Sequence, residues 1–137
     1  MKILKWLVGI VIAIPVLMFT IIYGASELSG EVITLDRKLE DGGVSSVRIW
    51  IVDQGDSAWI EQGDPSSFWI TNLANDPALT ITRNGETATY RGVPDPASHA
   101  LYHELRQAKY TWGDDIVNFI TGKGQNCPSV PVRIEKI

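Results

Sequence analysis

The sequence has little cysteine and little positive charge, and each shortage excludes a class of protein. Cys127 is the only cysteine among 137 residues, so a scaffold of intramolecular disulfides is excluded. Twelve basic residues stand against 16 acidic ones, which gives a net charge of −4. A protein that binds nucleic acid needs clustered lysine and arginine to displace counterions from the phosphates. We therefore expect no nucleic-acid partner.

Charged residues are lacking altogether between Trp6 and Ser26. An α-helix of these 21 residues, rising about 1.5 Å per residue, would span roughly 30 Å, the thickness of the hydrocarbon core of a bilayer. The stretch is longer than the apolar core of a typical signal peptide, and bulky Tyr23 does not suit a cleavage site. We therefore favour a membrane anchor over a cleaved signal. The sequence predicts three parts, an anchor over 1–26, a linker over 27–30 and a domain over 31–137.

The charges on the two sides of this stretch predict its orientation. Lys2 and Lys5 precede it, and Glu27 and Glu31 follow it. Because positive charge is retained on the cytoplasmic side, we expect a single-pass protein of the cell membrane with its domain on the extracytoplasmic side. Without the two lysines the rest of the chain carries a net charge of −6, so the domain is acidic.

Short β-rich runs and turn residues alternate through the predicted domain. Strands are expected over 31–37, 47–52, 58–62, 78–83, 86–93 and 129–135. Asn84-Gly85 is a strong hairpin signal, because both residues tolerate a positive φ. The strand over 47–52 is apolar on nearly both faces, which is typical of an enclosed strand. Six strands with inserted helices favour a β-rich α+β domain, folded as a small closed or split barrel.

Three helices are expected between the strands. The first begins at Asp64-Pro65, an N-cap followed by a first-turn proline, and ends at Asn75. The second begins at Pro94, and its apolar residues recur every three or four positions and form one stripe that should face the core. That stripe consists of Ala97, Leu101, Leu105, Ala108 and Trp112. Gly113 should break this helix, Asp114 should cap the third, and 122–126 should be a loop.

Two histidines and the lone cysteine are the residues with metal-binding or nucleophilic chemistry. His99 and His103 are four residues apart on the second helix, a spacing that can place two imidazoles on one metal ion. They fall on the face opposite the apolar stripe, with no third ligand at an obvious spacing. We therefore interpret them as a solvated surface pair and predict no metal site. Cys127 has no histidine at a recognisable spacing, so we assign it no nucleophilic role.

The segment from Phe68 to Pro77 resembles the aromatic-rich helix, ending in Asn-Leu-x-x-Asn-Pro, of the deazaflavin-dependent nitroreductase family. Four further segments are similar in the same order, 48–53, 90–94, 109–113 and 130–134. The family belongs to the flavin and deazaflavin oxidoreductase superfamily. The resemblance implies a split β-barrel of the pyridoxamine-phosphate-oxidase-like, FMN-binding type. Together with the strand pattern and the apolar stretch, it leads us to expect a six-stranded split β-barrel after one N-terminal transmembrane helix. It also implies that the barrel binds deazaflavin coenzyme F420 or FMN, and the split-barrel relatives suggest a homodimer.

The phosphate-binding segments depart from the family pattern. Relatives that bind the deazaflavin coenzyme carry a Gly-Arg-Lys-Ser-Gly-Lys-like segment, whereas 36–43 here keeps two cations and adds three acids. Oxidase-like relatives use a Ser-Arg-Lys cluster, and here the segment reads Ser66-Ser67-Phe68-Trp69. Two hypotheses follow. One is a membrane-anchored oxidoreductase that reduces a small hydrophobic substrate, quinone-like or nitroaromatic. The other is a non-enzymatic binding module that has lost its phosphate site, with a tetrapyrrole binder using His99 or His103 as a weaker variant.

Seven residues are candidates for the site, and none is assigned a catalytic role. The cofactor candidates are Arg48, Trp50, Ser66, Ser67 and Trp69. Arg48 lies among aliphatic neighbours and needs a partner, either a ligand phosphate or a carboxylate. The two serines lie at a helix N-terminus, whose free amides suit an anion, and the tryptophans could line a slot for a flat ring or pack in the core. Tyr110 and Trp112 match the place of substrate-side aromatics in the family, although Trp112 also continues the apolar stripe.

Overall fold

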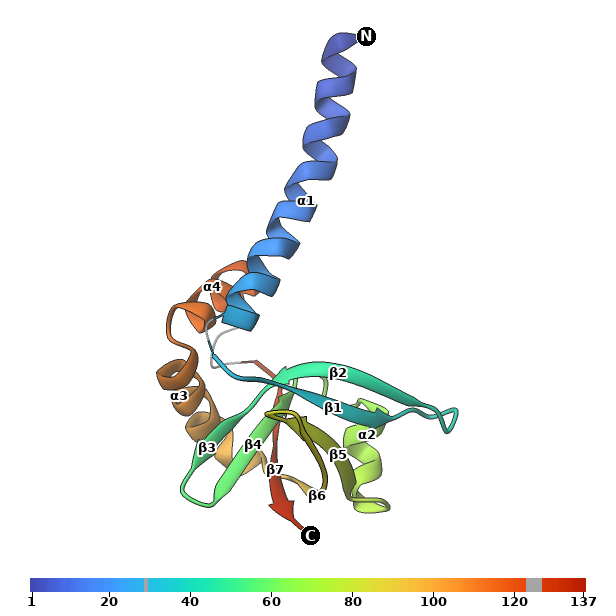
Figure 1. Cartoon of the computed structure of the whole chain (residues 1–137), viewed down its shortest axis with the longest axis vertical. Helices are drawn as coiled ribbons and strands as arrows, with labels where there is room; N and C mark the ends of the chain where they lie inside the picture. The colour runs from blue at the N-terminus through green and yellow to red at the C-terminus, as the bar shows by residue number, and fades with distance from the viewer. Residues whose placement is uncertain (29, 123–126) are drawn as a thin grey trace.

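A long apolar helix projects from one end of a curled β-sheet in the computed structural model, which describes residues 1–28, 30–122 and 127–137 (Figure 1). This helix, α1, spans Lys2–Leu28. Its segment Ile3–Ala25 has a mean hydropathy of 2.5, is exposed over most of its length, and is long and apolar enough to cross a membrane. It therefore fits either an anchor or a signal sequence. The helix also extends two residues into the predicted linker.

The domain is built on one antiparallel sheet of seven strands, in the order β2-β1-β5-β6-β7-β4-β3. The strands are β1 Val32–Lys38, β2 Val44–Trp50, β3 Val52–Gln54, β4 Ser57–Gln62, β5 Ala78–Arg83, β6 Glu86–Pro94 and β7 Val130–Lys136. The helices that follow α1 are α2 Phe68–Thr71, η1 Asn72–Ala74, η2 Pro96–Ser98, α3 His99–Tyr110 and α4 Trp112–Thr121. The sheet curls into a half-barrel that brings β2 close to β4.

Five of the six predicted strands are confirmed to within one residue, but the strand predicted over 47–52 is wrong. It divides at Ile51, because the chain there leaves β1, the partner of β2, and joins β4, the partner of β3. Strand β2 is therefore an edge strand rather than an enclosed one. The hairpin signal is confirmed, since Asn84 and Gly85 have φ angles of 52° and 80° and join β5 to β6.

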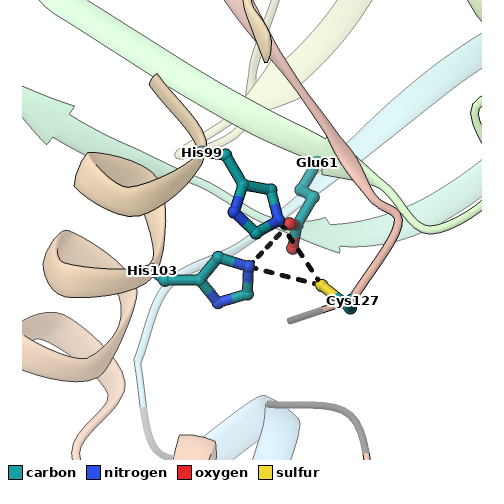
Figure 2. Close-up of side chains that lie close together, drawn as sticks. All are labelled: Glu61, His99, His103 and Cys127. Atoms are coloured by element: carbon teal, nitrogen blue, oxygen red, sulfur yellow. Dashed lines mark hydrogen bonds and ion pairs between the residues drawn. The ribbon is translucent and has the colours of Figure 1, made fainter. Parts of the chain in front are cut away.

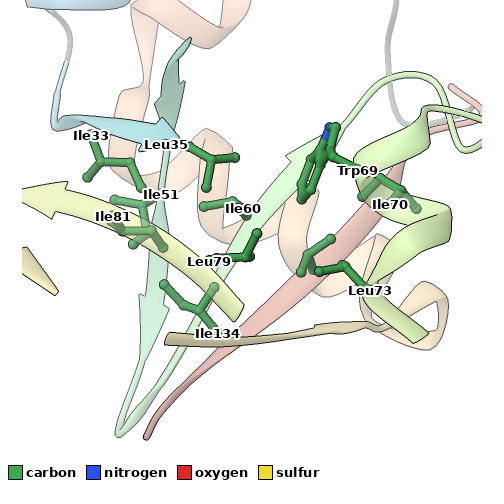
Figure 3. Packing of buried hydrophobic residues seen from close by; sticks show 11 residues of the cluster. Ile33, Leu35, Ile51, Ile60, Trp69, Ile70, Leu73, Leu79, Ile81 and Ile134 are labelled. Carbon is green, nitrogen blue, oxygen red and sulfur yellow. The ribbon is translucent and has the colours of Figure 1, made fainter. Parts of the chain in front are cut away.

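The main core lies between the inner face of the sheet and the short helix α2 (Figure 3). Trp69, Ile70 and Leu73 come from α2 and η1 and pack against aliphatic side chains of the strands. The long helix predicted from Pro65 to Asn75 is wrong, since only 68–74 are helical. Asp64 does not cap it, because its carboxylate accepts hydrogen bonds from the amide and the hydroxyl of Ser66 in a local turn.

Helix α3 packs on the sheet through a polar and aromatic face, and the predicted apolar stripe is wrong. The buried residues of α3 are Tyr102, His103 and Tyr110. Tyr102 and Tyr110 form a second core cluster with Val52 and Trp59. The stripe predicted to face the core is only half-buried at its two leucines and exposed at its other positions. His103 contacts Glu61 of β4, and the hydroxyl of Tyr110 bonds to the main chain of Glu31 and Ile51, so these two buried polar groups have partners.

The break between α3 and α4 lies at Thr111 rather than at Gly113. Thr111 has a φ of 41°, an uncommon conformation for a β-branched residue. Asp114 is buried within α4 instead of capping it. Gly122 ends α4 with a φ of 65°, and positions 123–126 of the predicted loop lie outside the described residues. Helix α4 packs beside the C-terminal end of α1 (Figure 1).

Side chains of α3 complete the backbone hydrogen bonding at the strand crossover. The hydroxyl of Tyr110 accepts a hydrogen bond from the amide of Ile51 at 3.0 Å, and it lies 2.8 Å from the carbonyl oxygen of the same residue. The ammonium of Lys109 donates to that carbonyl oxygen at 2.8 Å. Tyr110 also donates to the carbonyl of Glu31, just before β1. These contacts satisfy groups at Ile51 that the sheet ladder leaves unpaired.

A four-residue ion cluster surrounds the same point. Arg83 on β5 binds both carboxylate oxygens of Glu31, at 2.6 and 2.8 Å, and both of Asp53, at 2.8 Å. Lys109 adds ion pairs to Glu31 at 2.8 Å and to Asp53 at 3.2 Å. The hydrogen bonds from Arg83 hold the pKa of each carboxyl below its usual value, against the opposing effect of burial. The cluster thereby ties three strand segments to α3.

Replacing Tyr110 by phenylalanine tests the crossover contact. Tyr110→Phe keeps the ring but removes the partner of the buried Ile51 amide, so we expect the free energy of unfolding to fall by about 1–3 kcal/mol. Urea unfolding of the full chain in detergent, followed by tryptophan fluorescence, measures this change. Tyr90→Phe, at a half-buried tyrosine on β6, is the matched control. A Tyr110→Phe chain as stable as the wild type would contradict the assigned role.

The ion cluster predicts an acid dependence of stability. Because the folded pKa values of Glu31 and Asp53 lie below the ordinary 4.5 and 3.8, the cluster stabilises the fold fully above about pH 4.5. This contribution is lost as the pH falls through the lowered folded values. We expect Arg83→Gln to lower the free energy of unfolding by about 1–2 kcal/mol near neutral pH and by less in acid. Unfolding curves measured from about pH 3 to about pH 7 check this. Arg91→Gln, at an exposed arginine on β6, is the control. A constant difference at all pH values would refute it.

Candidate functional site

A groove lies where α1, β2, α3 and α4 meet, beside the second core cluster. Its volume is about 270 Å³. It is lined by Ile22, Arg48, Ile49, Trp50, Glu61, Tyr102, Arg106 and Val117. Ile22 belongs to the apolar segment of α1 and Val117 to α4, so the groove opens at the end of the membrane-compatible helix. Its position combines an aromatic wall with an apolar entrance.

Stacked aromatic rings form that wall. The indole of Trp50 stacks on the ring of Tyr110 with centroids 4.3 Å apart and planes inclined by 10°. The guanidinium of Arg106 lies 5.9 Å from the Trp50 ring and 5.8 Å from the Tyr102 ring, within the range of cation–π attraction. Such a surface suits a flat ring that also carries a polar atom, such as a carbonyl oxygen, for the cation to face.

The charge of Arg106 is balanced by neighbouring protein groups. Its nitrogen atoms lie 3.0 Å from Oε2 of Glu61, 2.7 Å from Oδ1 of Asp114 and 3.1 Å from Oδ1 of Asn118. The side chains of Arg106 and Asp114 are only 12% and 4% exposed. Asn118 in turn donates to Asp114 at 3.0 Å. Because two carboxylates already face this guanidinium, it is poorly placed to neutralise the phosphate of a ligand.

A cluster of ligand-type side chains adjoins the groove and shares Glu61 with it (Figure 2). His99 and His103 come from the start of α3, Glu61 from β4, and Cys127 from the segment before β7. Cys127 Sγ lies 3.4 Å from Nε2 of His103 and 3.7 Å from Nε2 of His99. Nε2 of His103 lies 3.1 Å from Oε1 of Glu61. Burial lowers the pKa of the His103 imidazole, against the opposing effect of the Glu61 carboxylate.

The expectation of a solvated histidine pair is therefore wrong. The side chain of His103 is only 2% exposed, and His99 is half-buried. Sequence reasoning missed the cluster because the wrong face of α3 was expected to be buried. The spacing of the two histidines was the available signal. Glu61 and Cys127 are distant in the sequence and join them only through the sheet, so their spacing carried no information.

The structure brings together two of the five cofactor candidates. Arg48 and Trp50 both line the groove from β2. Arg48 is exposed at the edge of the sheet, so the predicted burial among aliphatic neighbours is wrong. Trp50 is half-buried, with its ring against Tyr110.

The other three cofactor candidates lie at α2, across the sheet from α3 (Figure 1). Ser66 is exposed, and its amide is already bonded to the carboxylate of Asp64. Ser67 precedes a helix of only four residues, which offers a poor anion site. Trp69 is 4% exposed and belongs to the main core. The core alternative for Trp69 is thus confirmed.

The two substrate-side candidates have the opposite burial to the one that the sequence predicted. Tyr110 is fully buried, with its hydroxyl bonded to the main chain. Trp112 is 49% exposed rather than part of the core. The break at Thr111 explains this reversal, because Trp112 no longer continues the surface of α3. Neither residue lines the groove, although the ring of Tyr110 stacks on Trp50, which does line it.

The segments expected to hold a cofactor phosphate fit that group only in part. Lys38 is paired with Asp76, and Asp36 accepts a hydrogen bond from the hydroxyl of Ser46 at 2.5 Å. Arg37, the other cation of the 36–43 segment, has a buried Nε without a hydrogen-bond partner. One of the two cations and the amide of Ser66 are therefore already engaged, which leaves few free partners for the phosphate tail of F420 or FMN.

Comparison with known proteins places the fold. No family model and no curated protein matches the sequence. An F420-H2 dependent reductase is 12% identical, with 77% of this chain and 94% of that chain covered and a TM-score of 0.53. A candidate 5-nitroimidazole antibiotic resistance protein from Bacteroides thetaiotaomicron is 11% identical, with 77% and 72% covered and a TM-score of 0.52. A candidate pyridoxamine 5′-phosphate oxidase from Listeria innocua is 10% identical, with 83% and 89% covered and a TM-score of 0.52.

At these identities the likeness shows the fold alone. The domain is a split β-barrel of the pyridoxamine 5′-phosphate oxidase-like type, and it shares this fold with F420-dependent reductases. The resemblance and the α+β split-barrel class predicted from the sequence are confirmed. The number of strands is corrected from six to seven.

Arg106 should be essential to the stability of this region. Arg106→Met leaves Asp114 buried beside Glu61 without a compensating cation, so we expect the free energy of unfolding to fall by about 3–5 kcal/mol. Chemical unfolding of the full chain measures the loss. Arg91→Met, at an exposed arginine on β6, should change stability by no more than about 0.5 kcal/mol. Equal effects of the two substitutions would show that Arg106 does not hold the buried acids.

Proposed function

We propose that this protein is a membrane-anchored split-barrel protein that binds a flat, hydrophobic, quinone-like compound in the groove. The single observation that carries the proposal is the lining of the groove, which combines the aromatic rings of Trp50 and Tyr102 with Ile22 of α1. Its volume of about 270 Å³ suits a small ring system. It is smaller than the roughly 300–1,000 Å³ of sites that enclose larger ligands.

The surroundings of the groove favour a ligand that arrives from lipid. Helix α4 packs beside the end of α1 and exposes Phe119, which is 89% exposed, and Trp112. Exposed aromatic side chains next to a membrane-spanning helix are typical of the membrane interface. A lipid-soluble ring compound partitions into this same region. The anchor would therefore hold the groove in the same layer of the membrane interface in which the ligand accumulates.

The proposed topology is a single-pass anchor over 1–26, a linker over 27–30 and an extracytoplasmic domain over 31–137. It is supported by Lys2 and Lys5 at the start of α1 and by Glu27 and Glu31 around its end. A reporter fused at Ile137 that scores as cytoplasmic would reverse this orientation. The homodimer suggested by the split-barrel relatives stays a prediction.

The second candidate function is that of an oxidoreductase that uses F420 or FMN to reduce a quinone-like or nitroaromatic substrate. The fold shared with an F420-H2 dependent reductase favours it. The engagement of Lys38 and of the Ser66 amide by protein carboxylates, and the acidic domain, count against it, since both cofactors are anionic. An extracytoplasmic domain would also be separated from cytoplasmic reductants. The tetrapyrrole variant has less support, because Nε2 of both histidines points toward Cys127 rather than an open face.

Ligand titration separates these functions. We expect the full chain in lipid nanodiscs to bind menadione, and Trp50→Leu to weaken that binding about tenfold, because the stacked ring contributes about 0.5–1.5 kcal/mol beyond its area. Calorimetry or fluorescence quenching gives the dissociation constant. Trp112→Leu, at an exposed tryptophan outside the groove, is the matched control. An unchanged affinity of Trp50→Leu for menadione would show that menadione does not bind in the groove.

A parallel titration with FMN and with reduced F420 tests the oxidoreductase. Binding of either cofactor, followed by menadione-dependent oxidation of its reduced form, would favour the second candidate. Binding of menadione without either cofactor would favour a binding module. A chain that binds none of the three compounds would exclude both functions.

A further inference from the structure

Three separate elements bring four potential metal ligands to one point. His99 and His103 project from the first turns of α3, Glu61 projects from β4, and Cys127 precedes β7 (Figure 2). One ligand atom from each residue lies within 4.8 Å of the corresponding atom of every other. The cluster shares Glu61 with the groove, but its other three members do not line the groove.

Three of the six separations between these atoms lie close to the edges of a tetrahedron around a metal ion, and the other three are within 4.8 Å. Zinc bonds of about 2.0–2.3 Å to nitrogen, oxygen and sulfur correspond to edges of roughly 3.3–3.8 Å. The observed separations are 3.1 Å from His103 Nε2 to Glu61 Oε1, 3.4 Å from Cys127 Sγ to His103 Nε2, and 3.7 Å from Cys127 Sγ to His99 Nε2. Small inward or outward shifts of each side chain would place all four atoms on one ion.

The same geometry does not fit a catalytic triad of cysteine, histidine and glutamate. In a triad the imidazole contacts the nucleophile through one ring nitrogen and the orienting carboxylate through the other. Here Cys127 and Glu61 both approach Nε2 of His103. Because both groups meet the same ring nitrogen, the ring does not connect a nucleophile to an orienting carboxylate, whereas one cation between them could contact all three groups.

The neighbours of Glu61 hold its carboxylate in a ligating orientation. The hydroxyl of Ser129 donates to Oε1, while Arg106 binds Oε2 at 3.0 Å. The Glu61 side chain is 9% exposed. Contacts of this kind around a ligand carboxylate fix its direction and raise metal affinity. Arg106 is also paired with Asp114, so the positive charge of Arg106 is balanced without the metal site.

We propose that Glu61, His99, His103 and Cys127 form a closed, structural zinc site that joins α3 to β4 and to the start of β7. A thiolate and a carboxylate together carry two negative charges, which a divalent ion neutralises in this partly buried position. One sulfur, two nitrogen and one oxygen ligand suit a borderline-soft ion with tetrahedral preference. Four protein ligands leave no open position, so the ion holds the fold rather than activating water.

Metal content and cobalt substitution of the full chain in detergent test the site. We expect one zinc ion per chain after purification with zinc present and removal of loosely bound metal. Exchange for Co²⁺ should give the visible bands of a tetrahedral ion and a near-ultraviolet band from thiolate coordination. Because Cys127 is the only cysteine, Cys127→Ser should abolish that second band. A cobalt spectrum unchanged by Cys127→Ser would overturn the proposal.

Matched carboxylate variants separate ligation from fold effects. Glu61→Gln should lose zinc, whereas Glu104→Gln, at an exposed position of α3 beside the histidines, should retain it. Ser129→Ala should lower zinc affinity about 10–100-fold, as expected for loss of a contact to a ligand. Equal zinc content in Glu61→Gln and Glu104→Gln would remove Glu61 from the site.

The wild-type chain provides a test that does not depend on variants. Coordination withdraws the sulfur lone pairs, so zinc should slow the alkylation of Cys127 by iodoacetamide, and a chelator should restore the rate. Alkylation at the same rate with zinc and with chelator, in a chain that also purifies without metal, would refute the zinc site. Copper retained in place of zinc by the same four residues would refute the choice of zinc.

Discussion

The arrangement of the domain depends on the hydrogen bonds that α3 makes to the backbone of Ile51, where the chain crosses between the two ends of the sheet. The chain leaves one end of the sheet at Trp50 and enters the other end at Val52, so the backbone between them has no ladder partner on either side. Tyr110 and Lys109 of α3 supply the missing hydrogen bonds. A buried backbone group without a partner would cost on the order of 1–3 kcal/mol. This requirement fixes both the position and the rotation of α3.

Much of the sheet could be predicted from the sequence, because its signals are local. Alternation and turn residues locate five strands, and Asn84-Gly85 fixes the register of a hairpin. The division at Ile51 could not be predicted, because the residues on both sides favour a strand and only the closure of the sheet separates them. The length of α2 depends similarly on how Trp69 fits the core rather than on its own capping signals.

The site was predicted less well than the fold, for one physical reason. An apolar stripe normally identifies the buried face of a helix, but α3 buries Tyr102, His103 and Tyr110 and leaves Ala108 exposed. Their polar atoms meet carboxylates and backbone groups from strands far away in the sequence, and such partners leave no local pattern. The two groove residues that were predicted, Arg48 and Trp50, were found from residue chemistry, because a cation among aliphatic residues needs a partner and a tryptophan can line a slot for a flat ring. The shared fold by itself does not carry an activity.

The carboxylate of Glu61 faces two different environments. One oxygen lies beside His103 and Ser129, and the other is bound to Arg106, whose guanidinium stands over the ring of Trp50. A change of charge or position at the first oxygen therefore alters the strength with which the second holds the guanidinium. A metal ion bound at the cluster and a ligand bound in the groove would therefore be linked through this one side chain. Linkage of this kind is reciprocal, so each would change the affinity of the other by the same factor.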